Sequence, residues 1–232
     1  MGSILIKNKM KEHLLKLQKR DISWSSYSSW TYSKTEWARR YLEDIYTAPN
    51  EKMVYGNVIG KKLGEDPTFL PDVPRYKVME QKLKALVDGV KITGYLDSFC
   101  PETFAFYEYK TSSNDKKWTK ESAKKHGQIL FYMALIWKNY NIKPENIKCS
   151  LHYIPVEEYF EAPVEIDEDI FSEKNKPQVK MRLKEGQEVL HFDVKHTSME
   201  VLKFLKQVVK AYREMEEFAL AYKPESDIIT NS

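Results

Sequence analysis

Three charged side chains lie on two neighbouring apolar runs between residues 94 and 111. Asp97 comes late in the first run, and Glu108 and Lys110 lie two residues apart in the second. If both runs are strands, Glu108 and Lys110 point to the same face, because side chains alternate along a strand. Two carboxylates that converge at the edge of a core are costly unless a cation neutralises them. We therefore expect these side chains to bind a divalent metal ion.

A metal ion held there would support a particular chemistry. Mg²⁺ prefers oxygen ligands and usually keeps water and substrate phosphate in its other positions. A lysine beside it can orient a metal-bound water or stabilise charge on a phosphate. Asp97 followed by Glu108-x-Lys110 therefore predicts phosphodiester hydrolysis assisted by Mg²⁺ or Mn²⁺, with these three residues in catalytic roles.

Two similar triplets occur elsewhere, Glu80-x-Lys82 and Asp193-x-Lys195, and both fall in expected strands. An isolated triplet of this kind is most simply a salt-bridged surface pair. Glu80 lies in a run that is polar throughout, as in an edge strand. No strand-borne carboxylate precedes Asp193 at a comparable distance. We expect neither triplet to be catalytic.

The surrounding pattern predicts the elements that position these residues. Segments 76–87 and 91–100 flank Asp88-Gly89, which is typical of a hairpin. The other expected elements are helices at 4–19, 33–49 and 50–64, strands at 103–111 and 147–155, a helix at 119–140, an irregular acidic insertion at 157–186, and a C-terminal strand and helix within 187–222. This order predicts one α/β domain spanning 1–232, with a central mixed sheet flanked by helices.

The expected helix at 119–140 carries a second polar group. Gln128 and Tyr132 are four residues apart and so share a helical face. Lys120 and Lys124 would continue that face, which predicts contacts with nucleic-acid phosphates. A solvated helix face is the alternative interpretation of the lysine run.

With these residues in place, the chain resembles the PD-(D/E)xK nuclease superfamily. Within it, the chain is similar to the branch that contains the nuclease domain of the RecB helicase, CRISPR-associated RecB-like exonucleases and lambda-type phage exonucleases. The resemblance covers about residues 22–155 and rests on the motifs Gly94-x-x-Asp97, Glu108-Tyr109-Lys110 and Gln128-x-x-x-Tyr132. It implies a restriction-endonuclease-like α-β-β-β-α-β core.

The resemblance also implies roles and partners. The backbone carbonyl of Tyr109 would be a further metal ligand, Gln128 a catalytic positioning group, and Tyr132 a support for Gln128 or a contact to a sugar. The implied substrate is DNA, cleaved by an exonuclease in repair, recombination or phage replication, with a homo-oligomer or a replication or recombination protein as a possible partner. A catalytically weakened DNA-binding or assembly subunit that keeps the fold is the alternative.

The N-terminal part is similar to the opening pattern of the branch but lacks its cysteine. Serines and aromatic residues fit its opening pattern, at Ser23, Ser25, Trp30, Trp37 and Tyr41. Ser33-Lys34 replaces a Cys-Pro pair, however, and residues 222–232 contain no cysteine. In iron–sulfur members that cysteine joins a C-terminal cysteine trio, so we expect no iron–sulfur cluster.

A further departure concerns the helix at 50–64. Family members usually carry a His or Glu metal ligand there, and the matching position is Gly60. Glu51 and Glu65 are the nearby acidic alternatives. The resemblance then leaves one ion held by two carboxylates and a backbone carbonyl.

The composition of the chain excludes several other kinds of protein and site. The two cysteines among 232 residues exclude a disulfide framework and a four-cysteine metal site in this chain alone. A net charge of +3 is too small to indicate nucleic acid by itself, so a basic surface would have to be local. The sequence shows neither a run of about 18 apolar residues nor the apolar core of a signal peptide, which predicts a cytoplasmic protein, in the host cell if phage-encoded, with no membrane partner.

Overall fold

A central sheet organises the computed structural model, which describes residues 11–114, 117–161 and 178–223. Among these residues the sheet has six strands: β1 Val78–Val87, β2 Val90–Cys100, β3 Ala105–Ser112, β4 Lys148–Glu161, β5 Gln178–Leu183 and β6 Leu190–Val194. The order is β1-β2-β3-β4-β5, with β6 paired to β4. Strands β3 and β4 run parallel and the other neighbours are antiparallel. The predicted mixed sheet is confirmed.

The helical crossover between β3 and β4 explains their parallel pairing, because two parallel strands cannot be joined by a tight turn. It contains α5, Lys120–Lys124, and α6, Gly127–Tyr140. Helix α6 packs on β1 and β2. Its buried side chains, such as Ile129 and Met133, join Leu96 and Phe106 of the sheet in the main hydrophobic core.

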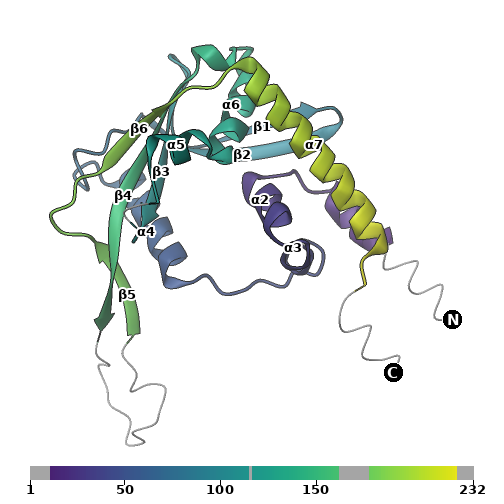
Figure 1. The fold of residues 1–232 in the computed structure, drawn as a ribbon, viewed down its shortest axis with the longest axis horizontal. Helices are drawn as coiled ribbons and strands as arrows, with labels where there is room; N and C mark the ends of the chain where they lie inside the picture. Colours follow the sequence, from purple (N-terminus) through teal and green to yellow (C-terminus); the bar gives the residue numbers. More distant parts are fainter. Residues whose placement is uncertain (1–10, 115–116, 162–177, 224–232) are drawn as a thin grey trace, which may run out of the picture.

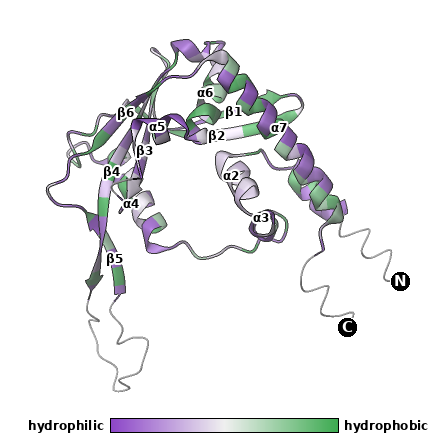
Figure 2. Cartoon of the chain, viewed as in Figure 1, coloured by the Kyte–Doolittle hydropathy of each residue, from purple (hydrophilic) through white to green (hydrophobic). Residues whose placement is uncertain are grey.

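Helices cover both faces of the sheet (Figure 1). Helix α7, Ser198–Ala221, packs on α6 and on α2, Trp24–Tyr32. Hydrophilic and hydrophobic residues interleave along α7, as a helix with one buried face requires (Figure 2). Helix α3 is Lys34–Tyr41.

On the opposite face lies α4, Glu51–Glu65, whose Ile59 and Leu63 pack with Tyr109 and Ile154 in a second core cluster. The element order α4-β1-β2-β3-α6-β4 is the predicted α-β-β-β-α-β core, so the restriction-endonuclease-like fold class is confirmed. No helix in the described ranges is long and apolar enough to span a membrane.

The predicted helix at 119–140 is wrong as one element, because the chain breaks at His126 between α5 and α6. His126 has extended backbone angles and packs edge-on against Trp118, with 5.2 Å between ring centroids. A Cβ atom on Gly127 would lie 2.6 Å from the Trp24 ring. Packing against Trp24, which is distant in the sequence, and against the nearby Trp118 therefore favours this break, which helical periodicity does not reveal.

Two other boundaries differ from the sequence prediction. The insertion expected at 157–186 is partly regular: β4 continues to Glu161 and pairs with β5, while residues 162–177 lie outside the described ranges. The helix expected at 33–49 ends at Tyr41, and α2 precedes it with Ser23 as its N-cap. Of the helix expected at 4–19, residues 11–18 are helical and residues 1–10 lie outside the described part.

Candidate active site

The neighbouring strands β2 and β3 bring the three sequence-predicted residues together. Glu108 is fully buried, and its Oε1 lies 2.6 Å from Nζ of Lys110. The backbone N–H of Tyr109 donates a hydrogen bond of 2.8 Å to Oδ2 of Asp97. Both carboxylates and the lysine line one cleft. The expected convergence is present in the structure, while the catalytic roles stay predictions.

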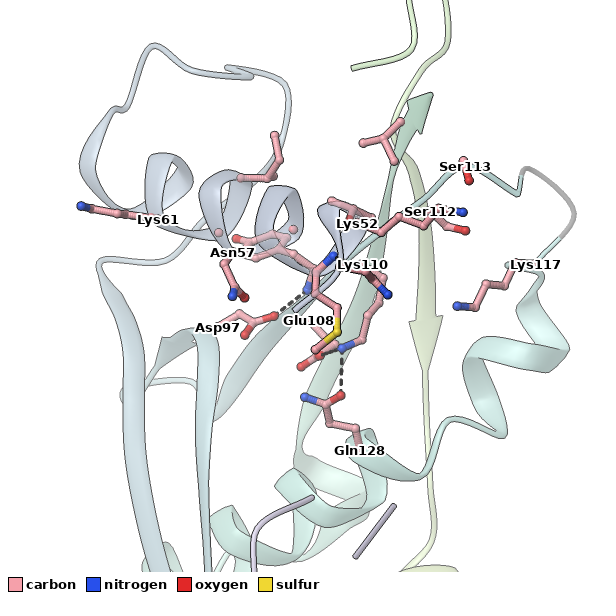
Figure 3. A pocket seen from close by; sticks show the side chains of 18 of the residues that line it. Lys52, Asn57, Lys61, Asp97, Glu108, Lys110, Ser112, Ser113, Lys117 and Gln128 are labelled. Carbon is pink, nitrogen blue, oxygen red and sulfur yellow. Dashed lines mark hydrogen bonds and ion pairs between the residues drawn. The ribbon is translucent and has the colours of Figure 1, made fainter. Parts of the chain in front are cut away.

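A short chain of hydrogen bonds connects Lys110 to helix α6. Nζ of Lys110 donates to Oε1 of Gln128 at 2.8 Å, and Nε2 of Gln128 donates to the hydroxyl oxygen of Tyr132 at 2.8 Å. Figure 3 shows Lys110 reaching down to Gln128. The predicted shared face of Gln128 and Tyr132 is therefore used to hold the lysine.

Tyr132 is positioned by a glycine of the adjacent strand. Its ring is buried, and a Cβ atom on Gly94 would lie 2.7 Å from Cε1 of that ring. Such a contact is shorter than carbon atoms tolerate, so only glycine fits at this position of Gly94-x-x-Asp97. Burial of the Tyr132 ring favours its role as a support for Gln128 over a contact to substrate.

The buried charges are not balanced within the site. Burial, followed by the charge of Asp97, raises the pKa of Glu108 to about 8. Burial also raises the pKa of Asp97, although Lys110 and the Tyr109 N–H oppose it. Burial disfavours the charged form of Lys110, but Glu108 and Asp97 outweigh this and its pKa is raised. If both carboxylates were ionised, the site would hold one more negative charge than its lysine neutralises, and the raised pKa of Glu108 means that the metal-free protein keeps a proton there up to about pH 8.

The carboxylates fit a cation. Oε2 of Glu108 is fully buried and accepts no hydrogen bond from any residue that the structure describes. A buried, unpartnered carboxylate oxygen is the kind of group that a bound ion would satisfy. Over the described ranges, no three His, Cys, Asp or Glu side chains lie close enough to hold a metal ion as they stand. Two carboxylates are thus in place for an ion that would take its other ligands from backbone, water or substrate.

The cleft has a volume of about 940 Å³ and extends between β3, α4 and the start of α6. Polar residues of α4 and the β3–α5 connection face it, including Asn57, Ser113 and Lys117 (Figure 3). Gly56 lets α4 approach the sheet, since a Cβ atom there would lie 3.0 Å from Oγ1 of Thr111. The cleft is large enough for a nucleotide-sized group beside the carboxylates.

The continuous face predicted for Lys120, Lys124 and Gln128 is wrong, because the break at His126 separates α5 from α6. Nζ of Lys124 lies 3.9 Å from Oε1 of Glu200, outside the cleft lining. Lys117 lines the cleft instead, and sequence reasoning missed it. Its membership of the same lysine run, just before the helix, was the available signal.

The surface-pair interpretation of Glu80 is also wrong. Strand β1 is an edge strand as expected, but Glu80 lines the cleft with Asp97 and Glu108. Nζ of Lys82 lies 5.0 Å over the Tyr95 ring. Burial, and then the charge of Asp97, raises the pKa of Glu80.

The other acidic candidates lie elsewhere. Asp193 lies in β6, opposite Ser150 of β4 in the sheet register, and lines a separate pocket. Glu65 lies 3.8 Å from Nζ of Lys61, and neither Glu65 nor Glu51 is among the described residues that line the cleft. Gly60 does line it, with no atom within 4 Å of a Cβ built there.

Comparison with known proteins finds solved structures of similar fold but low sequence identity. No protein-family model matches the chain, and no curated protein matches its sequence. The crystal structure of a phage-related exonuclease from Haemophilus somnus 129PT is similar, with a TM-score of 0.50 and 14% identity over 90% of this chain and 93% of that chain.

Two further solved structures are similar over most of their length. The protein SSO0001 has a TM-score of 0.46 and 16% identity, over 90% of this chain and 85% of that chain. A protein from Eubacterium rectale has a TM-score of 0.48 and 11% identity, over 87% of this chain and 83% of that chain. At these identities, the likeness to the Haemophilus structure shows a shared fold.

Proposed function

We propose that this protein is a metal-dependent deoxyribonuclease that acts as an exonuclease. The observation that carries the proposal is the fully buried Glu108, whose Oε2 accepts no hydrogen bond within the described ranges, beside Asp97 and Lys110 in an open cleft. Two buried carboxylates beside one lysine are stabilised in their ionised forms by a bound cation, and a cleft gives a phosphate access to that cation.

The residues present fit Mg²⁺ or Mn²⁺, which Asp97, Glu108 and the backbone carbonyl of Tyr109 would hold. When bound, the ion would supply Lewis acidity toward a phosphate oxygen and lower the pKa of a coordinated water. In the hydrolysis a water oxygen forms a bond to phosphorus, and the bond from phosphorus to one ester oxygen breaks.

Lys110 contributes positive charge where negative charge develops on the phosphate. Its ammonium stays protonated at neutral pH because the two carboxylates raise its pKa. Gln128, supported by Tyr132, fixes the direction of the Lys110 side chain through the bond of 2.8 Å to its Oε1. Preorganised donors of this kind need no rearrangement during the reaction.

The DNA backbone is proposed to pass through the cleft beside Lys117 and to continue toward Lys120 and Lys124 on α5. Exposed lysines bind phosphates without sequence preference and release counterions as they do so. The exonuclease assignment is supported by the structural likeness to the phage-related exonuclease of Haemophilus somnus. DNA repair, recombination and phage replication are the processes that such an activity would serve.

An assay with end-labelled single-stranded and double-stranded DNA in Mg²⁺ or Mn²⁺ tests the proposal. We expect mononucleotides released from one end, and no cleavage with EDTA or by the Asp97→Asn variant. Internal cuts would make the enzyme an endonuclease. Cleavage that persists in both EDTA and Asp97→Asn would contradict the proposed site.

A second function, a DNA-binding or assembly subunit, is favoured by one observation. Within the described ranges no three candidate ligand side chains converge, and the helix wall of the cleft carries Gly60. DNA binding without cleavage under every metal condition would support this second function.

A further inference from the structure

Glu80 lies opposite Asp97 in the sheet. Met79 pairs with Ser98 and the antiparallel register continues beyond them, so Glu80 and Asp97 face each other although they are not themselves a paired step of the ladder. The backbone of Glu80 explains the interruption, because its φ is +52°. Residues other than glycine rarely adopt this left-handed backbone conformation. In the middle of a strand, such a conformation interrupts the hydrogen bonding to the neighbouring strand.

The strained backbone coincides with the cleft. Glu80 lines it with Asp97 and Glu108, from the strand that flanks the carboxylate pair on the side away from Lys110. Backbone strain costs stability and persists where the surrounding structure maintains it, often at ligand sites. Here it accompanies an independent sign of a missing cation, the buried Oε2 of Glu108 that accepts no hydrogen bond in the described part of the chain.

The opposite wall of the cleft offers no competing carboxylate among the described residues. Helix α4 presents Gly60 there, whereas Glu51 and Glu65 are not part of the described lining. Glu80 is exposed and has three side-chain torsions, so its carboxylate can turn toward an ion near Asp97. It can also reach the ion through a coordinated water, which Mg²⁺ commonly retains.

We propose that Glu80 is the third carboxylate of the metal site, contributed by β1 and brought to the ion by rotation of its side chain. This inference rests on the proposed metal-dependent function. It deepens that function by assigning a ligand that neither Glu108-Tyr109-Lys110 nor helix α4 supplies.

Titration calorimetry of the full chain with Mn²⁺, without DNA, tests this assignment. Glu80→Gln keeps the side-chain length and removes the charge, and we expect Mn²⁺ binding about 10- to 100-fold weaker. Glu65→Gln is the matched control and should bind within about twofold of the wild type, because Glu65 is exposed, is not part of the described cleft lining and lies 3.8 Å from Nζ of Lys61. Asp97→Asn should lose binding.

The possible failures can be distinguished. If Asp97→Asn loses Mn²⁺ binding while Glu80→Gln matches the wild type, the Glu80 assignment is wrong and the proposed function survives. If the wild type and Asp97→Asn bind Mn²⁺ equally, the metal site itself is wrong. Equal weakening by Glu80→Gln and Glu65→Gln would indicate a general loss of surface charge and would overturn the Glu80 assignment.

A second variant separates ligation from a structural role. Asparagine tolerates positive φ better than glutamate, but its side chain is shorter. We expect Glu80→Asn to unfold at the same or a higher temperature than the wild type without metal, and to gain less thermal stability from Mn²⁺. A lower melting temperature without metal together with an unchanged gain from Mn²⁺ would show that Glu80 only maintains the strand.

Discussion

The ring of Tyr132 occupies the space that a side chain at Gly94 would need, with 2.7 Å from a Cβ atom at that position to Cε1 of the ring. This contact joins the strand that carries Asp97 to the helix that carries Gln128. Tyr132 accepts a hydrogen bond from Gln128, and Gln128 accepts one from Lys110. A side chain added at Gly94 would therefore displace Tyr132 and, through Gln128, change the position of the Lys110 ammonium.

We therefore expect Gly94→Ala to reduce both stability and cleavage. The added methyl group overpacks the core, which typically costs about 1–3 kcal/mol, and displaces the support of Gln128. Urea denaturation and steady-state cleavage measure the two effects. Gly60→Ala is the control, because nothing lies within 4 Å of its Cβ position and alanine favours a helix by about 1 kcal/mol. An equally stable and active Gly94→Ala protein would show that the contact relaxes without consequence.

Glu108→Gln and Lys110→Ala should each lower turnover by about 100-fold or more, which corresponds to about 3 kcal/mol of transition-state stabilisation. The first removes a metal ligand and the second removes a charge next to the phosphate. Circular dichroism should show an intact fold in both. Asp193→Asn, in a separate pocket, should cleave at the wild-type rate. If Asp193→Asn were inactive and Glu108→Gln active, the active site would lie at β6, and its assignment to β3 would be wrong.

Relative to the Glu108→Gln variant, the metal-free wild type should lose stability as the pH rises from about 5 to about 8. His126, His152 and His196, whose pKa values burial lowers, act in the opposite direction but do so in both proteins. Burial raises the pKa of Glu108 from 4.5 to about 8, so in this range the folded protein keeps a proton that the unfolded chain releases. Raising the pH then favours the unfolded chain, by up to about 1.4 kcal/mol per pH unit for one proton.

Melting temperatures of the wild type and of Glu108→Gln, measured in EDTA across this pH range, show in which direction stability changes with pH. The difference in melting temperature between the wild type and Glu108→Gln should fall as the pH rises, and Asp97, whose pKa burial also raises, adds to the dependence that remains in the variant. Saturating Mn²⁺ should flatten the dependence in the wild type. A difference between the wild type and Glu108→Gln that stayed constant or grew in favour of the wild type as the pH rose would contradict the assignment.

Lys117→Ala should weaken DNA binding across all sequences and lower the slope of log K against log salt by about one. Lys117 lines the cleft, whereas Lys124 lies outside the cleft lining near Glu200. We therefore expect a smaller change in slope for Lys124→Ala. Fluorescence anisotropy at several salt concentrations, with Ca²⁺ in place of Mg²⁺ to limit cleavage, compares the two variants. Identical slopes for both variants and the wild type would place the DNA path elsewhere.

The purified protein should contain no iron and show no visible absorbance band. The cysteines are Cys100 and Cys149, and neither falls at a position where the iron–sulfur members of the nuclease branch that the sequence resembles hold their cluster. Elemental analysis alongside the absorption spectrum checks this expectation. Stoichiometric iron that tracks with colour would overturn it.

Local periodicity in the sequence was enough to predict the centre of the site. Strand alternation placed Glu108 and Lys110 on one face, and the turn at Asp88-Gly89 predicted that β1 and β2 pair as a hairpin. Helical spacing placed Gln128 beside Tyr132, and their hydrogen bond follows from that spacing. These relationships depend on residues close in the chain, so their types and spacing determine them.

The tertiary structure decided which additional residues reach the cleft. Packing of Trp24 against Gly127 and of Trp118 against His126 breaks the predicted helix, which separates Lys124 from Gln128. The left-handed backbone of Glu80 and its register with Asp97 make an apparent surface residue part of the cleft. A sequence shows which residues can carry charge, but the free energy of non-local packing decides which of those charges share one low-dielectric space.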